Sequence, residues 1–246
     1  SLEECFEEMT PHIFAIETGL SSDPAMNWRL SKLDKVAIIS NSDAHSLPKL
    51  GREANVFDTE LSYDAIIMAI KNREPSEFLF TIEFFPEEGK YHYDVHRNCS
   101  HSIDPAKSRS DICPKCGRKM TIGVLHRVEE LADRPAGGRS ELIIPYKSLV
   151  PLNEIIAESF GVGVASKRVQ EAYHKLVFAI GNEFRVLLES SRSEIEAVAG
   201  AGIAEAVMRV REGKLHIEPG YDGVYGKITI FEEAERQVIK PQSTLF

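Results

Sequence analysis

Cysteines and long apolar runs are both scarce in this sequence. Four of the 246 residues are cysteine and one is tryptophan, which excludes a small secreted scaffold built on many disulfides. No segment approaches the roughly 18 uninterrupted apolar residues of a membrane helix. The first residues, SLEECFEEM, are acidic, whereas a secretion signal starts with basic residues. We therefore expect a cytoplasmic protein with no membrane partner, in which cysteines are more often metal ligands or redox groups than disulfides.

Three of the four cysteines lie between Cys99 and Met120. His96 and Cys99 form one short-spaced pair, thirteen residues follow, and Cys113 and Cys116 form a second pair in CPKCG. Two such pairs supply the four ligands of a tetrahedral zinc, so we predict a structural Zn²⁺. The turn residues around Cys113 argue against a redox pair at a helix start. Four other side chains stay open as the fourth ligand: His92, Asp94, His101 and His126.

The chain as a whole carries fewer basic than acidic side chains, 29 against 38, and its net charge is −9. Residues 1–89 carry 7 basic and 17 acidic side chains, but residues 90–147 carry 11 basic and 7 acidic ones. The basic excess thus coincides with the predicted zinc segment and could meet DNA phosphates; a solvated surface loop is the alternative. The candidate contacts are Arg97, Lys107, Arg109, Lys115, Arg118, Lys119 and Arg127.

A second set of candidate ligands follows the apolar run VAII at residues 36–39. The run is typical of a strand buried in a parallel sheet, and Asp43 and His45 come directly after it. An Asp-x-His pair at a strand end can hold divalent metal, although a turn residue beside a surface histidine has the same pattern. Glu17 follows another apolar strand and is a weaker candidate for the same cluster.

The C-terminal third is helical by pattern, with one long helix expected over residues 169–189, and apolar residues at helical spacing also predict a helix over residues 63–72. Within the C-terminal third, VAGAGIAEAVMRVREG resembles a helix-hairpin-helix, in which the turn at Gly200 and Gly202 presents backbone amides to a phosphate. A tight corner between two packed helices is the alternative interpretation. The last residues offer Gln242, Leu245 and Phe246, a loose match to a sliding-clamp-binding tail.

Longer sequence segments carry a family resemblance. SNSDAHSLPKLGREANVF, GKYHYDVHRNC, ICPKCG and IEPGYDGVYGKI, which reach almost from end to end, resemble the PHP-domain proteins of the endonuclease Q type. The resemblance implies an α/β chain with the C-terminal part of a distorted β/α barrel at residues 1–76. The residue pattern adds a zinc-binding module at 77–134, a linker rich in proline and glycine at 135–150 and a helical region at 151–246 that ends in a hairpin.

The same resemblance implies a metal-dependent endonuclease that cuts DNA next to deaminated bases or abasic sites. Asp43 and His45 match the last metal motif of the family and are thereby expected to be catalytic ligands, with Zn²⁺, Mn²⁺ or Mg²⁺ as the ion. The departure lies upstream, since no His-x-His motif precedes Asp43. We therefore expect a C-terminal portion that lacks the ligands for the usual metal cluster and can be inactive alone, with the missing N-terminal half as a possible partner. A DNA-binding scaffold without chemistry and a phosphoesterase for a small metabolite remain as alternatives.

Overall fold

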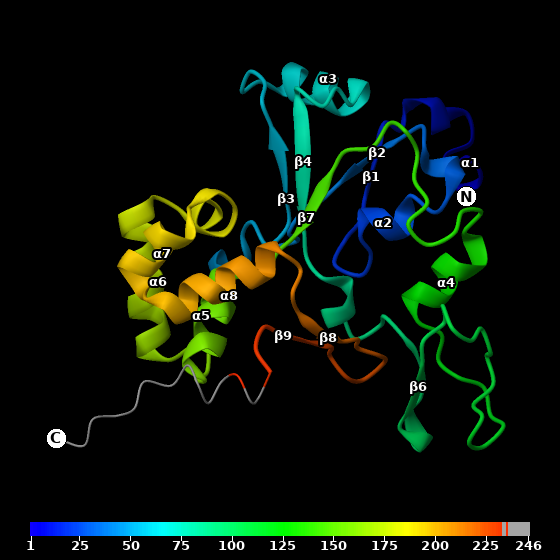
Figure 1. The fold of residues 1–246 in the computed structure, drawn as a ribbon. Coiled ribbons are helices and arrows are strands. Elements are labelled where there is room, and N and C mark those ends of the chain that lie inside the picture. Colours follow the sequence, from blue (N-terminus) through cyan, green and yellow to red (C-terminus); the bar gives the residue numbers. More distant parts are fainter. Residues whose placement is uncertain (233–234, 236–246) are drawn as a thin grey trace. The chain divides into compact units, whose positions relative to one another are not determined.

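The computed structural model describes residues 1–232 and residue 235. The chain forms two compact units (Figure 1). The first comprises residues 1–148 together with 219–226, and the second comprises residues 149–218 and the chain from Lys227 onward. The chain therefore leaves the first unit, builds most of the second and returns to the first for eight residues. The sequence-based domain boundaries did not include this return and stay a prediction.

Two short parallel strands begin the first unit. β1 (Ala15–Glu17) pairs with β2 (Ala37–Ile39), with Ala15 opposite Ala37. Val36, Ala37 and Ile38 are buried, as the apolar run predicts. Because parallel strands end at the same edge, the segments that follow Glu17 and Ile39 emerge side by side.

A three-stranded sheet lies next in the chain. β4 (Phe78–Glu83) is central, antiparallel to β3 (Ala54–Phe57) and parallel to β7 (Tyr146–Ser148). Residues 146–148 of the predicted linker thus form a strand. The hydroxyl of Ser40 donates to the carbonyl of Ile82 at 2.7 Å, which ties the end of β2 to β4. In residues 1–232 these strands form open sheets and no closed barrel, so the barrel stays a prediction.

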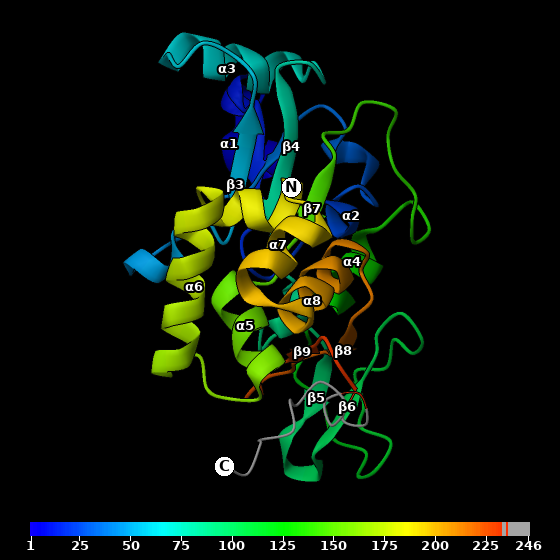
Figure 2. The same ribbon diagram turned by 60° about the vertical axis from the view of Figure 1, so that its left-hand side comes forward.

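Three helices precede the cysteine-bearing segment in this unit, namely α1 (Leu2–Phe6), α2 (Pro24–Asn27) and α3 (Tyr63–Asn72). α3 matches the helix that the sequence predicts at 63–72 and lies at the tip of the β3–β4 hairpin in Figures 1 and 2. The side chain of Ser62 caps it by accepting from the amide of Ala65, which satisfies one unpaired donor of the first turn.

The cysteine-bearing segment is a small hairpin followed by a helix. β5 (Asp94–His96) and β6 (His101–Ile103) are antiparallel neighbours, and α4 (Val124–Leu131) follows (Figure 2). A bidentate ion pair between Arg29 and Glu129 joins α4 to the segment after α2, and both side chains are about nine-tenths buried. Arg134 likewise binds Asp34, with its Nη2 2.5 Å from the carboxylate. These pairs hold the first hundred residues and the cysteine segment together as one unit.

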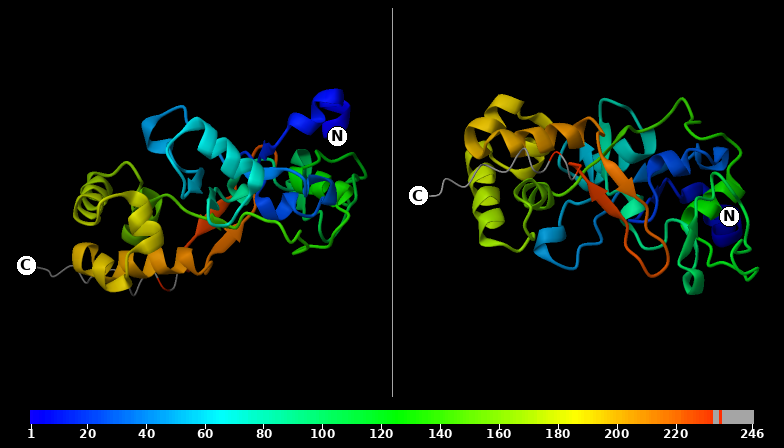
Figure 3. Two further views of the ribbon diagram at one scale, coloured as in Figure 1. Left: turned by 90° about the horizontal axis from the view of Figure 1, so that it is seen from above. Right: turned by 60° about the horizontal axis from the view of Figure 1, so that its bottom comes forward.

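The second unit is mainly helical, and its helices form one group in both views of Figure 3. Leu152, Ile155, Leu176, Ile195 and Ile203 are at most 2% exposed and form its core. The elements are α5 (Leu152–Phe160), α6 (Lys167–Ile180), the π-helical turn Arg185–Glu189, α7 (Arg192–Ala199), α8 (Ala201–Arg211), β8 (His216–Glu218) and β9 (Lys227–Thr229).

One prediction for this unit is wrong. The sequence pattern favours a single long helix over residues 169–189, but α6 ends at Ile180. Gly181 has φ of +124°, a conformation that only glycine adopts readily, and the chain turns there before the π-helical segment. The apolar spacing of residues 169–189 did not reveal the break, because apolar residues recur at helical spacing on both sides of Gly181.

The N-terminus of α7 allows a first prediction. Ser191 Oγ accepts from the amide of Glu194 at 3.3 Å, and the amide of Ser191 donates to the Glu194 carboxylate at 2.7 Å. We expect Ser191→Ala to lower the free energy of unfolding by about 1 kcal/mol, because this reciprocal cap is lost. Urea titration followed by helical circular dichroism measures it. Ser191→Thr keeps the cap oxygen and serves as the control; an equal loss in both variants would contradict the capping argument.

Candidate functional site

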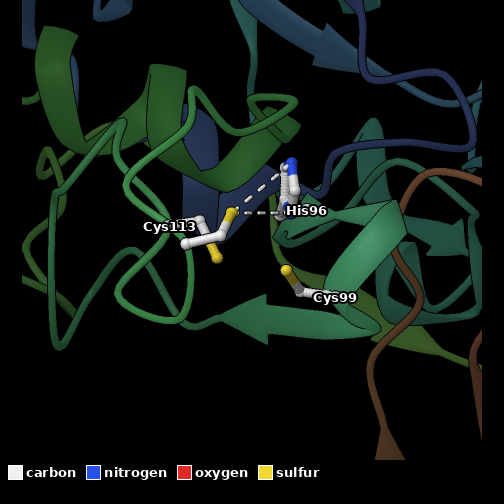
Figure 4. Close-up of side chains that lie close together, drawn as sticks. His96, Cys99 and Cys113 are labelled. Atoms are coloured by element: carbon white, nitrogen blue, oxygen red, sulfur yellow. Dashed lines mark hydrogen bonds between the residues drawn. The ribbon is translucent and has the colours of Figure 1, made fainter.

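Four ligand-type side chains gather at the end of the β5–β6 hairpin. The ligand atoms of His96, Cys99, Cys113 and Cys116 all lie within 4.8 Å of one another. His96 ends β5, Cys99 ends the turn that follows it, and Cys113 and Cys116 come from the CPKCG turn. The side chains of His96, Cys99 and Cys113 converge in Figure 4, and Cys116 Sγ is 3.5 Å from Nδ1 of His96.

The CPKCG turn has the geometry of a metal-binding knuckle. The amide of Gly117 donates to the carbonyl of Cys113 at 2.8 Å, and the amide of Cys113 donates to the carbonyl of Arg118 at 2.8 Å. Gly117 has φ of +71°, which a residue with a Cβ adopts at a cost. The turn therefore directs both cysteine sulfurs to one side.

The donor set fits a tetrahedral metal ion. Zn–S and Zn–N distances of roughly 2.0–2.3 Å place the ligand atoms of such a site about 3.3–3.8 Å apart, within reach of the observed spread of 4.8 Å. The four cysteines of the chain are free thiols, so no disulfide competes for them. The hydrogen bond to Cys116 raises the pKa of the Cys99 thiol to about 11. A bound cation reverses this effect because it deprotonates coordinating thiols. The group can thus hold a metal such as zinc.

The alternative fourth ligands have other roles or positions. Asp94 is fully buried and its carboxylate contacts Nδ1 of His126 at 2.5 Å and accepts from the amide of Gly123 at 2.7 Å. His92 is buried against the ring of Tyr93, and burial lowers its pKa to about 4. His101 pairs with His96 across the hairpin. Among the described residues, the gathered ligand group contains His96 and none of these four.

The seven basic candidates of this region are all exposed. Several also bind neighbours within the protein. Arg97 pairs with Asp222 at 2.5 Å, Lys107 with Asp104 at 3.2 Å and Arg127 with Glu130 at 2.7 Å. Arg109 donates to the carbonyl of Glu129, and Lys115 donates to the carbonyl of Cys99. The remaining members, Arg118 and Lys119, lie directly after the cysteine knuckle. Exposed pairs of this kind exchange readily with phosphate oxygens.

The second candidate cluster lies beyond the end of β2. Asp43 Oδ1 and His45 Nε2 are 3.5 Å apart, and both side chains are exposed, at 74% and 90%. Asp43 has φ of +44°, a strained value for a non-glycine residue that occurs often at functional turns. Glu17 ends β1 at the same edge of the parallel pair and is exposed. Asp43 and His45 form a close pair, and among the described residues they are not part of a gathered group of three or more metal-type ligands.

Two buried glutamates near this edge were missed by the sequence analysis. Glu53 is 2% exposed and Glu83 is fully buried. Glu83 accepts from the hydroxyl of Thr18 at 3.0 Å and from that of Thr81 at 2.5 Å. Glu53 Oε1 accepts weakly from the amide of Phe84 at 3.4 Å, whereas its Oε2 has no partner within the described part of the chain. The sequence offered a signal for Glu83 alone, because this carboxylate lies inside the apolar run FLFTIEFF.

Burial affects both carboxyl groups in the same direction. It raises the pKa of Glu53 to about 7, with the neighbouring charge of Glu83 as the next cause. It also raises the pKa of Glu83 to about 7, against the two threonine hydrogen bonds that lower it. Asn55 on β3 is bonded to the end of β2, because its side chain accepts from the amide of Ser40 at 2.9 Å and donates to the carbonyl of Ser40 at 2.7 Å.

Two family models match parts of this chain. Residues 28–75 match the PHP-associated model, and residues 151–214 match the model of the MJ0043 C-terminal domain. The chain is 33% identical over 242 residues to protein MJ0043 of Methanocaldococcus jannaschii, covering 93% of this chain and 29% of that protein. It is 32% identical over 233 residues to YqxK of Bacillus subtilis, covering 93% and 55%.

Two solved structures have similar folds. One is the lesion-specific endonuclease PfuEndoQ from Pyrococcus furiosus, with a TM-score of 0.84, 34% identity and coverage of 99% of this chain and 60% of that one. The other is an endonuclease Q in complex with a 27-mer duplex that has an abasic lesion at the active site, with a TM-score of 0.79, 33% identity and coverage of 99% and 61%.

The chain therefore spans less than two thirds of the length of each of these relatives. Within that span the similarity is continuous, since it covers 99% of this chain in both structures. It also agrees with the PHP-associated match at residues 28–75. These similarities confirm the resemblance to PHP-domain proteins of the endonuclease Q type that the sequence segments indicate.

Proposed function

We propose that this chain contributes to metal-dependent hydrolysis of DNA phosphodiesters next to deaminated bases or abasic sites. The observation that carries the proposal is the similarity to an endonuclease Q bound to duplex DNA with an abasic lesion at its active site. The Asp43–His45 pair, with 3.5 Å between Oδ1 and Nε2, supports it because carboxylate and imidazole are the usual ligands of a hydrolytic metal.

In this proposal Asp43 and His45 hold a divalent ion, Zn²⁺, Mn²⁺ or Mg²⁺, and Glu17 is a weaker additional ligand. Such an ion lowers the pKa of water and stabilises charge on the attacked phosphate. The chain's own residues position the pair: β2 delivers the turn, and Asn55 ties Ser40 and Asn41 in place. β1 and β2 would belong to the distorted barrel of the family.

The zinc site has a structural role in the proposal, because four protein ligands leave no open position for substrate. His96, Cys99, Cys113 and Cys116 would hold Zn²⁺ and keep the basic side chains around them in place. The seven basic residues of the segment would then meet phosphate oxygens without reading sequence. Their charges make binding sensitive to salt.

Gly200 and Gly202 provide a second proposed contact with DNA. α7 ends at Ala199, Gly200 has φ of +88°, and α8 starts at Ala201 without a side-chain cap. Gly202 lies inside the first turn of α8 rather than in the connecting turn. Backbone amides at such an uncapped helix start favour a phosphate.

The sliding-clamp tail at Gln242, Leu245 and Phe246 lies outside the described residues and stays a prediction, as does the cytoplasmic location. Among the residues that the structure describes, no helix is long and apolar enough to cross a membrane.

A nicking assay tests the proposal. The substrates are duplexes with one deoxyuridine, deoxyinosine or abasic site, supplied with Mn²⁺, Mg²⁺ or Zn²⁺, and PfuEndoQ is the positive control. We expect nicking by this chain that is lost in Asp43→Ala, because the ion loses its carboxylate ligand, and is kept in Glu60→Ala, which removes an exposed carboxylate elsewhere. Binding of the lesion duplex without nicking, under conditions where PfuEndoQ cuts, would contradict the proposal and favour the non-catalytic scaffold.

A further inference from the structure

The turn at residues 219–226 is attached to the cysteine-bearing unit by backbone hydrogen bonds. The amide of Gly220 donates to the carbonyl of Glu87 at 2.7 Å, and its carbonyl accepts from the amide of Tyr93 at 2.9 Å. The amide of Gly226 donates to the carbonyl of Glu88 at 3.0 Å. Both ends of the turn are therefore fixed to the segment 87–93.

The contact is too close for side chains. A Cβ on Gly220 would lie 2.3 Å from the carbonyl oxygen of Gly89, so only glycine allows this approach. Tyr221 and Val224 close the turn with mutual backbone bonds of 3.0 and 2.7 Å. Arg97 holds its flank through Asp222, with bonds of 2.5 Å to the carboxylate and 3.2 Å to the carbonyl. The turn is consequently a rigid support.

This support presents aromatic surface to solvent. Tyr225 is 72% exposed and Tyr91, on the fixed segment, is 50% exposed. The ammonium of Lys90 lies 5.4 Å from the centre of the Tyr91 ring and 5.5 Å from that of the Tyr225 ring. Two accessible rings thus share one cation. Packing does not explain the Tyr225 ring, because most of its surface contacts no protein atom.

We propose that Lys90, Tyr91 and Tyr225 form a platform on which an unpaired nucleobase stacks while Lys90 binds the adjacent phosphate. Accessible aromatic rings with an interleaved cation are the usual means of holding single-stranded nucleic acid. Arg97, which holds the turn, belongs to the basic segment. The inference rests on the proposed function in one respect, since it takes DNA as the partner, and it adds where an unstacked base is held.

Binding, measured separately from nicking, tests the platform. The probe is a short single-stranded oligonucleotide with a central 2-aminopurine, whose fluorescence falls when the base stacks. We expect Tyr225→Ala to raise Kd by roughly 5- to 150-fold, since a stacked base contributes about 1–3 kcal/mol, and to abolish the quenching. Tyr225→Phe keeps the ring and should bind as the parent does. Tyr63→Ala removes another tyrosine that is 78% exposed and should have no effect.

Lys90→Ala tests the contribution of the cation to binding apart from that of the rings. It should lower the slope of log Kd against log salt by about one phosphate contact, whereas Tyr225→Ala should leave that slope unchanged. If Tyr225→Ala binds and quenches like the parent, the platform is wrong even when nicking is intact. If nicking fails but Tyr225→Ala still weakens binding, the proposed catalysis is wrong and the platform stands. If Tyr225→Phe loses as much as Tyr225→Ala, a hydrogen bond rather than stacking is involved and the platform is wrong.

Discussion

Removal of the metal from the Cys/His cluster is expected to unfold the segment from about residue 94 to residue 121. Few contacts lie within this segment itself: β5 and β6 share three residue pairs, and its buried apolar side chains are Val95, Pro105, Cys113 and Met120. Segments below about 40 residues generally need a metal or disulfides to fold. A structural zinc supplies about 10–16 kcal/mol of apparent binding free energy at pH 7, which is therefore folding free energy here.

Metal content and hydrogen exchange measure this effect. Cys113→Ser should lose the bound zinc, and amides of the β5–β6 hairpin should exchange at the rate of an unfolded chain after chelation. Cys5→Ser is the matched control, because Cys5 is exposed and outside the cluster; it should retain one zinc per chain. Equal protection of the hairpin before and after chelation would show that packing alone folds this segment.

The second large effect concerns the buried glutamates. Both have a pKa of about 7 in the folded protein against a model-peptide value of 4.5, mainly because burial disfavours the charged form. An acid whose pKa is raised by folding stabilises the fold fully below pH 4.5, and this contribution is lost as pH rises from about 4.5 to about 7. At 1.36 kcal/mol for each pKa unit, one such group destabilises the fold at pH 8 by about 3 kcal/mol.

Glu53→Gln removes one charge and keeps the side-chain shape. We choose Glu53 because its Oε2 lacks a partner within the described residues, whereas Glu83 accepts from two threonines. The variant should be more stable than the parent by up to about 3 kcal/mol at pH 8 and equally stable near pH 4.5. Urea titrations at both pH values give this difference, in which groups that titrate independently of Glu53 cancel. Glu60→Gln, an exposed carboxylate, should follow the parent; a parent-like profile for Glu53→Gln would contradict the argument.

Local features of this chain were accessible from sequence. The candidate metal ligands come as two close pairs in the sequence, and the geometry gathers the same four side chains. The helix at 63–72 and the hairpin of β8 and β9 also follow from local pattern. In each case the residues that carry the pattern lie near one another in the sequence.

Features that depend on distant residues were not accessible. Glu53 and Glu83 are thirty residues apart and become neighbours only because β3 and β4 pair. Nothing in the sequence around IEPGYDGVYGKI distinguishes a turn that stays with its own hairpin from one that packs on residues 87–93. Asp43 and His45 were identified by resemblance, and their geometry supplies a pair of ligands rather than a complete cluster.

The return of residues 219–226 to the first unit has a consequence for biosynthesis. A ribosome that has just released residue 148 has produced almost the whole first unit, but not the turn that bonds to Glu87, Glu88 and Tyr93. At about 5–20 residues per second the missing piece is translated on the order of 4 to 16 s later. During that interval the edge formed by residues 87–93 is open, and a nascent chain stalled there would offer it to chaperones.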